Sequence, residues 1–187
     1  MTTERFLKLL VAVAAVGVVI ALLAPSHREP PPIPARAAPD FEFFVQDQRH
    51  SLRELQGQVV LLNFWASWCE PCVAEMPSLE QLHRALRPRG LYVLAVSVDE
   101  NKQAYEEFIR RNRLTFATYR DPQKKIAARY GTFKFPESYL IDRNGILQRK
   151  VIGAIDWADP QVVTYMNQLL ERPYRGAESA GPRTGSP

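Results

Sequence analysis

The only two cysteines in this chain of 187 residues, Cys69 and Cys72, stand two residues apart in the segment FWASWCEPC. Three kinds of chemistry use such a pair: a structural disulfide, half of a metal site, or a dithiol that exchanges disulfides with other proteins. The choice depends on the compartment of the protein and on the elements that position the two sulfurs.

Metal binding and a purely structural bridge both fit this spacing poorly. A structural zinc ion needs four ligands, and the obvious candidates beside the cysteines are His27, His50 and His83. A bridge that closes a two-residue loop removes little conformational entropy from the unfolded chain. We therefore expect no metal site, and a working dithiol is favoured over a structural bridge.

A working dithiol has a physical basis in the expected start of a helix. Val59–Trp65 is a continuous apolar run, typical of a strand buried on both faces, and a helical pattern follows over Cys72–Leu86. Cys69 would lie where strand becomes helix, and the free N–H groups there favour a thiolate. Pro71 suits the first helical turn, which does not need its N–H. Cys72 could then resolve a mixed disulfide on Cys69.

The N-terminal segment predicts export from the cytosol. Phe6–Ala24 is apolar apart from Lys8, and as a helix its 19 residues would measure roughly 28 Å, close to the hydrocarbon thickness of a bilayer. A cleaved signal peptide is the alternative, although Leu-Leu-Ala before Pro25 is a poor cleavage site. We expect a signal anchor over residues 1–24 and a proline-rich linker over residues 25–39. Both interpretations place the domain where disulfides persist.

The net charge of +4 lies outside the predicted domain, residues 40–171. That segment carries 17 basic and 17 acidic side chains, so the excess of positive charge belongs to the flanks. Nucleic-acid binding requires a basic footprint on the folded part, and we therefore expect none. The tail, residues 172–187, lacks apolar periodicity and is predicted to be disordered.

Strand-like and helix-like segments alternate within the domain, which indicates an α/β fold around a mixed sheet. The first long buried strand ends at the cysteines, and ligands of open α/β sheets bind beyond such carboxyl ends. Asn-Gly in DRNG predicts a tight hairpin between the last two strands. The expected strands cover residues 41–45, 59–65, 91–98, 115–119, 138–141 and 146–151, and the expected helices cover 51–57, 72–86, 102–113, 124–130 and 160–171.

One carboxylate falls within the apolar stripe of the helix that follows the cysteines. At 100° per residue, Glu75 lies on the buried face, one turn from Cys72. A buried carboxyl group there would have a raised pKa and could exchange protons with a thiol. Alternatively, Pro77 could bend the helix and release Glu75 to solvent; the residues alone leave both possibilities open. His83 shares this face, where we expect a hydrogen-bonded core histidine.

Several motifs together resemble one protein family. FWASWCEPC followed by EMPSLE, the strand end VSVDE, and the later FPESYLIDRNG are similar to the membrane-anchored thioredoxin-like TlpA/ResA and CcmG/DsbE-like thiol-disulfide oxidoreductases. The resemblance covers about residues 40–171. It implies the thioredoxin fold, a mixed central β-sheet flanked by helices, with an N-terminal strand extension and a central βα insertion. CEPC resembles the ResA group, whereas PES-YLID resembles the CcmG group.

The resemblance also implies roles for individual residues. Cys69 would be the nucleophile, Cys72 the resolving thiol of the same redox disulfide, and Glu75 a proton shuttle. Phe135–Pro136 would be a cis peptide that faces the dithiol, with Pro136 shaping the client groove. Phe135 departs from the Thr or Val that is frequent before this proline. The residues expected to contact clients are Trp68, Glu70, Pro71, Phe135 and Pro136.

The function implied by the resemblance is reduction of client disulfides by a membrane-tethered enzyme on the extracytoplasmic (periplasmic) side. The implied client is apocytochrome c during cytochrome c maturation, before haem attachment. The implied electron donor is a membrane thiol reductase of the CcdA/DsbD type, and no diffusible cofactor is implied.

Other functions stay open from the sequence. The segment YRDPQKKIAARYGT is similar to peroxiredoxins, but neither cysteine lies in the P-x-x-x-T-x-x-C motif that those enzymes typically carry. A disulfide-forming thiol oxidase would use the same dithiol in the opposite direction. A non-catalytic tethered binding module would keep its disulfide inert, and dithiothreitol would then fail to reduce the pair without unfolding the domain.

Overall fold

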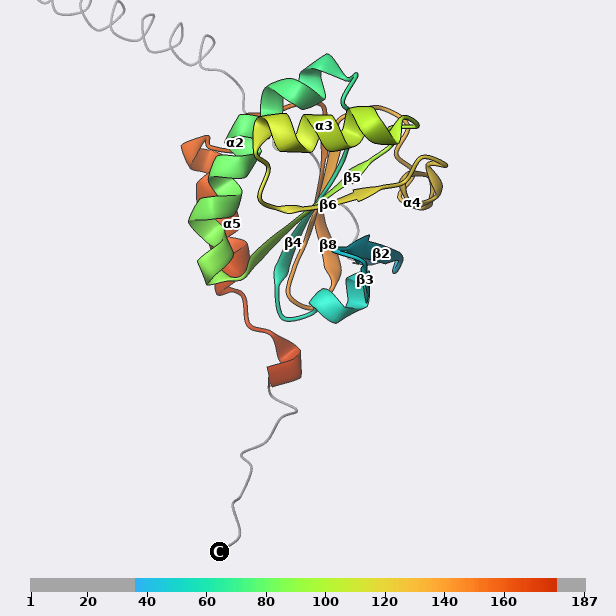
Figure 1. Ribbon diagram of the computed structural model, residues 1–187. Coiled ribbons are helices and arrows are strands. Elements are labelled where there is room, and N and C mark those ends of the chain that lie inside the picture. Colours follow the sequence, from blue (N-terminus) through green and yellow to red (C-terminus); the bar gives the residue numbers. More distant parts are fainter. Residues whose placement is uncertain (1–35, 178–187) are drawn as a thin grey trace, which may run out of the picture. The chain divides into compact units, whose positions relative to one another are not determined.

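The computed structural model describes residues 36–177 (Figure 1). The predicted signal anchor, most of the predicted linker and the end of the predicted tail lie outside the described residues. Within residues 36–177, no helix has both the length and the apolar character needed to cross a membrane.

A six-stranded mixed sheet forms the centre of the fold. Its strands are β1 (Arg36–Ala37), β4 (Val59–Trp65), β5 (Leu91–Ser97), β6 (Ala117–Arg120), β7 (Glu137–Ile141) and β8 (Ile146–Ile152). They follow the order β1-β8-β7-β4-β5-β6. β4, β5 and β6 are parallel, whereas β7 is antiparallel to both β4 and β8, and β1 is antiparallel to β8. This is the mixed α/β sheet expected from the sequence.

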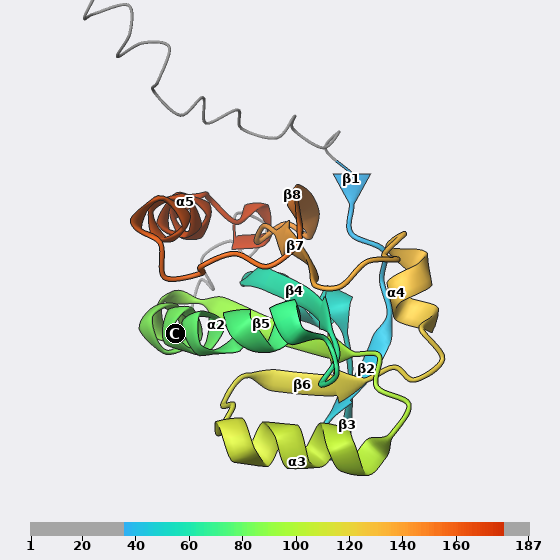
Figure 2. The same ribbon diagram turned by 90° about the horizontal axis from the view of Figure 1, so that it is seen from above.

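Helices cover both faces of this sheet (Figures 1 and 2). They are α2 (Glu70–Leu86), α3 (Lys102–Asn112), α4 (Lys125–Arg129) and α5 (Pro160–Glu171), joined by the short 3-10 turns η1 (Leu52–Leu55), η2 (Arg87–Arg89) and η3 (Arg175–Ala177). α2, α3 and α5 lie on one face. α4 lies on the other, with a separate hairpin of β2 (Glu42–Val45) and β3 (Gln48–Ser51).

β4 is buried along its whole length because both faces are covered. On the α2 side, Trp65 is fully buried, and its ring centroid lies 4.9 Å from that of Phe108 in α3. On the α4 side, the ring centroid of Phe64 lies 5.6 Å from that of Tyr130, just after α4. The expectation that VVLLNFW forms a strand buried on both faces is confirmed.

The β2–β3 hairpin differs from the single strand expected over residues 41–45. β2 pairs with β3 rather than with the main sheet. Its two-residue turn has Gln46 and Asp47 at φ 50° and 62°, a left-handed conformation that hairpin turns require and that usually selects Asn-Gly or Asp-Gly. Because neither pair is present and Gln48–Ser51 is polar, the sequence carried little signal for this hairpin.

Both flanks of the predicted domain also extend beyond its expected limits. Arg36 and Ala37, assigned to the linker, pair with the start of β8 as an edge strand. At the other end, residues expected to be disordered contact the hairpin that joins β7 and β8: the Arg175 N–H donates to Asn144 Oδ1 at 3.0 Å, and Asn144 Nδ2 donates to the Pro173 carbonyl at 3.3 Å. These short segments gain order from hydrogen bonds to distant residues, which local composition does not reveal.

The burial of β4 predicts a steep cost for truncating its side chains. Leu61 is fully buried, so Leu61→Ala should lower the free energy of unfolding of the oxidised protein by about 2–5 kcal/mol. Ile152 in β8 is 65% exposed, and Ile152→Ala should change it by less than about 0.5 kcal/mol. Urea denaturation of both variants measures the difference; equal effects would contradict the packing described here.

Candidate active site

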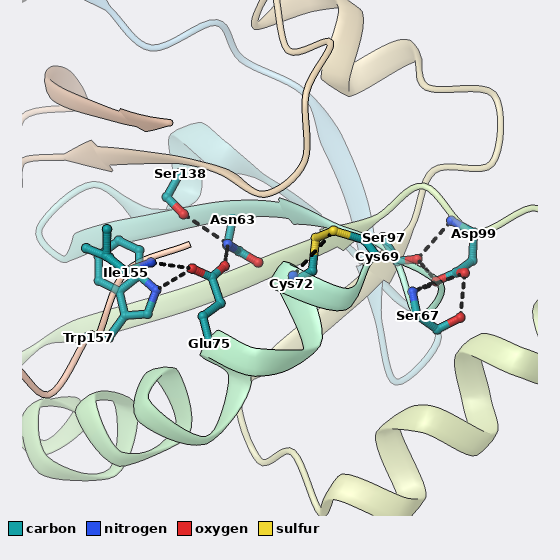
Figure 3. The surroundings of a disulfide bond; sticks show 10 residues. All are labelled: Asn63, Ser67, Cys69, Cys72, Glu75, Ser97, Asp99, Ser138, Ile155 and Trp157. Atoms are coloured by element: carbon teal, nitrogen blue, oxygen red, sulfur yellow. Dashed lines mark hydrogen bonds between the residues drawn. A yellow bond between two sulfur atoms is a disulfide. The ribbon is translucent and has the colours of Figure 1, made fainter. Parts of the chain in front are cut away.

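Cys69 and Cys72 form a disulfide at the start of α2 (Figure 3). Cys69 is the N-cap residue of the helix, and its sulfur accepts the backbone N–H of Cys72 at 3.3 Å. Cys69 is 6% exposed, whereas Cys72 is completely buried. Cys69 is therefore the sulfur closer to solvent, and the unpaired N–H groups of the helix start favour negative charge on it.

Exposed aromatic side chains border the disulfide. Trp68 is 65% exposed, and its ring packs edge-on against Phe135 with centroids 6.3 Å apart. The Phe135–Pro136 peptide is cis, as the resemblance implied. Two further apolar side chains are largely exposed. Phe133 precedes this peptide by two residues, and Ile152 pairs with Glu137, which directly follows it. Trp68 and Phe135 thus form a partly exposed apolar surface beside Cys69.

Glu70 and Pro71 separate the two cysteines along the first turn of α2. Glu70 is exposed as the first helical residue, where its negative charge complements the helix dipole. Pro71 lies in the first turn, as expected, because that position needs no N–H donor. The helix begins at Glu70, two residues earlier than the pattern predicted.

Glu75 is a buried carboxyl group on the Cys72 side of the disulfide (Figure 3). It is 2% exposed, and its oxygens accept hydrogen bonds from Asn63 Nδ2 at 2.8 Å, Trp157 Nε1 at 3.1 Å and the Ile155 N–H at 3.4 Å. Burial raises the pKa of Glu75 above its ordinary value, and these hydrogen bonds only partly oppose the rise. The position in the apolar stripe is confirmed, and the alternative in which Pro77 releases Glu75 to solvent is wrong.

Three partners of Glu75 were not identified from the sequence. Asn63 was the one polar residue within the buried run VVLLNFW, and that exception was the available signal. Its amide also donates to Ser138 Oγ at 2.9 Å, which links α2 to β4 and β7. Trp157 and Ile155 lie in the loop between β8 and α5, about 80 positions away along the chain, and no local pattern connects them with Glu75.

His83 is buried without the hydrogen bond that was expected. It is 6% exposed, and neither ring nitrogen has a hydrogen-bond partner among the described residues. Its ring meets Phe116 edge-on at 5.9 Å. Burial lowers the pKa of His83, so the ring packs as a neutral aromatic group. The prediction of a core histidine is confirmed, and the prediction of its hydrogen bond is wrong.

Comparison with known proteins shows which families this chain is similar to. Residues 34–150 match the AhpC/TSA family. Thiol-disulfide oxidoreductase ResA of Geobacillus thermodenitrificans is 37% identical over 123 residues, which is 65% of this chain and 71% of the relative. ResA of Bacillus anthracis is 34% identical over 119 residues, 63% of this chain and 69% of the relative.

The chain is also similar to solved structures of thiol-disulfide exchange proteins. A candidate thiol:disulfide interchange protein DsbE from Chlorobium tepidum superposes with a TM-score of 0.68 at 29% identity, over 73% of this chain and 96% of that one. StoA from Bacillus subtilis has a TM-score of 0.59 at 27% identity, over 70% of this chain and 99% of that one. The chain belongs to the AhpC/TSA family and, within it, to the TlpA/ResA and CcmG/DsbE-like thiol-disulfide oxidoreductases. Its fold is the thioredoxin fold.

The chemistry of this thiol-disulfide oxidoreductase resides in the bonded pair at the start of α2. Cys69 and Cys72 are bonded to each other, as thiol-disulfide exchange within a C-x-x-C motif requires. The peroxiredoxin alternative gains no support from the named relatives, which are thiol-disulfide oxidoreductases. The non-catalytic binding module is likewise set aside, because the chain is an oxidoreductase by these relationships.

Glu75 should give the stability of this oxidoreductase a distinct pH dependence. Because the folded pKa is raised above the ordinary value of 4.5, the folded protein binds the proton more tightly than the unfolded chain. Wild-type stability should therefore fall as pH rises from about 4.5 through the raised pKa. Glu75→Gln should remove this fall. The amide can be accommodated, since rotation of the Asn63 side chain presents its unpaired Oδ1 as an acceptor.

Urea denaturation between pH 4 and 8 tests this expectation in the oxidised protein. The stability difference between Glu75→Gln and wild type should grow in favour of the variant as pH rises. Glu70→Gln is the control, because it removes an exposed carboxylate from the same helix and should not reproduce the change expected for Glu75→Gln. A parallel profile for Glu75→Gln and wild type would contradict a raised pKa.

Proposed function

We propose that this thiol-disulfide oxidoreductase reduces client disulfides with Cys69 as its nucleophile. The observation that carries the proposal is the position of the Cys69 sulfur, which caps α2 and is the less buried of the pair. In the first step the Cys69 thiolate attacks a client disulfide. A Cys69–client bond forms, the client bond breaks, and one client sulfur leaves as a thiolate.

The second step returns the enzyme to the oxidised form. Cys72 loses its proton and attacks the Cys69 sulfur, so that the Cys69–Cys72 bond forms and the second client sulfur leaves. Two electrons thus pass from the enzyme to the client. We assign Glu75 as the acceptor of the Cys72 proton, since it is a buried carboxyl group one helical turn away whose raised pKa suits proton exchange.

The surroundings of the dithiol favour reduction of clients over disulfide formation. A strong oxidant needs a stabilised Cys69 thiolate. Here Glu70 and Glu75 place negative charge near the sulfur, and no Lys or Arg lies in residues 68–81 to offset it. These charges disfavour the thiolate and so favour the oxidised enzyme, which is the product of client reduction.

The family resemblance supplies the biological setting of the proposal. We propose an extracytoplasmic enzyme tethered by residues 1–24, with apocytochrome c as client and a membrane thiol reductase of the CcdA/DsbD type as electron donor. The relatives named ResA support the reaction type and say nothing further about these partners. Trapping by a Cys72→Ser variant in membranes, followed by identification of the disulfide-linked proteins, tests the client class.

The two cysteines should react in a fixed order. In the reduced protein, iodoacetamide should modify Cys69 before Cys72, because only Cys69 combines partial exposure with the helix N-terminus. Cys72→Ser should accumulate mixed disulfides with clients, whereas Cys69→Ser should not. Peptide mass spectrometry of partially alkylated protein measures the order, and equal modification of both thiols would refute the assignment.

The reduction potential distinguishes a reductant from a disulfide-forming oxidase. Related dithiols range from about −270 mV for thioredoxin to about −120 mV for the oxidant DsbA. We expect a value below about −200 mV, near the reducing end. Equilibration of the protein with glutathione redox buffers measures this potential. A value near −120 mV, together with rapid oxidation of reduced client peptides, would reverse the proposed direction.

A further inference from the structure

A second buried carboxylate, Asp99, lies at the end of the sheet that carries the dithiol. It follows β5 and is 1% exposed. The backbone N–H of Ser67 donates to its two oxygens at 3.2 and 2.9 Å, and Ser67 Oγ donates to Oδ1 at 2.7 Å. Ser97 Oγ donates to Oδ2 at 2.6 Å and accepts the Asp99 N–H at 3.0 Å. The carboxylate is thus fully occupied by neutral donors.

Ser67 belongs to the turn that delivers the nucleophile. Ser67 lies between β4 and α2, two residues before Cys69. The turn is closed by the Cys69 N–H, which donates to the Ala66 carbonyl at 3.2 Å. Asp99 therefore ties this turn to the end of β5. Figure 3 shows Asp99 and Ser67 on the Cys69 side of the disulfide, whereas Glu75 lies on the Cys72 side.

The negative charge of Asp99 lacks a direct ionic partner. None of the ion pairs within residues 36–177 includes this carboxylate. Arg120 donates instead to the backbone carbonyls of Asp99 and Glu100, at 3.3 and 3.1 Å. A charge held by neutral dipoles in a buried setting is weakly screened, so its field reaches neighbouring groups.

We propose that Asp99 is a positioning residue of the dithiol, whose carboxylate anchors the turn before Cys69 and opposes negative charge on the Cys69 sulfur. The inference rests on the proposed function in taking Cys69 as the reacting sulfur. Repulsion between the Asp99 carboxylate and the Cys69 thiolate raises the free energy of the reduced enzyme. Asp99 therefore makes the dithiol a stronger reductant. Three carboxylates, rather than the two on α2, then act on this site.

Other charged groups at this end of the sheet set the background for the effect of Asp99. Arg120 weakens the field of Asp99 in part, and the ring of Tyr105, which has a pKa raised by burial, is neutral. Asp121 is a second buried carboxylate at this end of the sheet: its N–H donates to the Ser97 carbonyl at 2.7 Å, and its oxygens accept the N–H groups of Lys125 and Ile126. Other charged groups on the neighbouring elements are Glu70 and Glu75 on α2, Glu100 with its partner Lys124, Lys134, and the pair Glu137 and Lys150. All of them stay unchanged in the variants below.

Replacing Asp99 with Asn in the full-length protein tests the inference. Asn has nearly the same shape and no charge, so the midpoint of the pH profile for Cys69 alkylation should fall by about half a unit or more, a threefold change. Above that midpoint, the equilibrium constant for oxidation by glutathione disulfide should fall at least threefold, which corresponds to about 15 mV. An unchanged midpoint in a folded variant would overturn the inference.

Two further variants separate charge from structure. Asp142→Asn is the matched control. Asp142 is also buried, and it accepts the backbone N–H groups of Asn144 at 2.9 Å and Ile146 at 3.0 Å. It lies in the turn between β7 and β8, at the end of β7 that is farther from Pro136. This variant should lose stability and keep the wild-type alkylation midpoint. Ser67→Ala removes one hydroxyl group and keeps the charge of Asp99, so the pH midpoint of Cys69 alkylation should shift by less than about half a unit. A shift equal to that of Asp99→Asn would overturn the electrostatic role.

A wild-type measurement removes the dependence on variant folding. Because coupling between two charges is reciprocal, the carboxyl carbon resonance of Asp99 in the reduced protein should move as Cys69 titrates, whereas that of Asp142 should not. No movement at Asp99 would overturn the inference. If Cys72 rather than Cys69 is alkylated first in wild type, the proposed function itself fails. If Cys69 reacts first and Asp99 proves uncoupled, this inference alone fails.

Discussion

The parallel pairing of β4 with β5 is the constraint on which the site depends. The register runs over seven residues, from Val59 opposite Leu91 to Trp65 opposite Ser97, so both strands end at the same edge of the sheet. The segments that follow must then lie side by side, and the Val98 N–H donates to the Trp65 carbonyl at 2.9 Å. The turn before Cys69 and the carboxylate of Asp99 meet because two hydrophobic strands pair in this register.

Two carboxyl groups on α2 show how partners decide the consequence of burial. Burial raises the pKa of Glu75, and only the neutral donors Asn63, Trp157 and the Ile155 N–H oppose it. At Glu80 burial also acts to raise the pKa, but hydrogen bonds from Thr115 and the charge of Arg84, at 2.6 Å, outweigh it and lower the pKa. Thr115, with a smaller contribution from Arg84, thus keeps Glu80 ionised as a structural link, whereas the donors around Glu75 do not outweigh its burial and leave its pKa raised.

The sequence predicted those parts of the fold that depend on local pattern. The apolar run of β4 and the helix of Pro160–Glu171 follow from periodicity and hold in the structure. Periodicity also placed Glu75 on the apolar face of α2 but left open whether its carboxyl group is buried, and the structure shows that it is. The cis peptide at Pro136 came from family resemblance, since local chemistry rarely selects it. The β2–β3 hairpin was missed because its left-handed turn is made by Gln46 and Asp47, without the Asn-Gly or Asp-Gly pair that usually marks such a turn.

The parts of the site that sequence did not predict are those made by contacts between distant segments. Asn63 and Asp99 each carried a weak signal: a polar residue within a buried strand, and an acid at a strand's carboxyl end. Trp157 carried none, because a tryptophan in a loop is compatible with many packing arrangements. Which donors reach Glu75 depends on how the loop after β8 lies beside α2, where both Ile155 and Trp157 contact the carboxyl group.

The redox properties of the dithiol depend on residues both inside and outside the C-x-x-C motif. The residues that perform the exchange are adjacent in sequence and read as one motif, whereas the groups that set their charge come from β4, β5 and the loop before α5. Trp157 donates two hydrogen bonds to α2: its backbone N–H donates to Ser78 Oγ at 3.0 Å, and its indole Nε1–H donates to Glu75 at 3.1 Å. With Glu75 in its proposed role, a substitution in that loop would alter proton transfer at Cys72 and leave the motif unchanged. Relatives that share the C-x-x-C sequence can therefore differ in redox behaviour through residues that the motif does not contain.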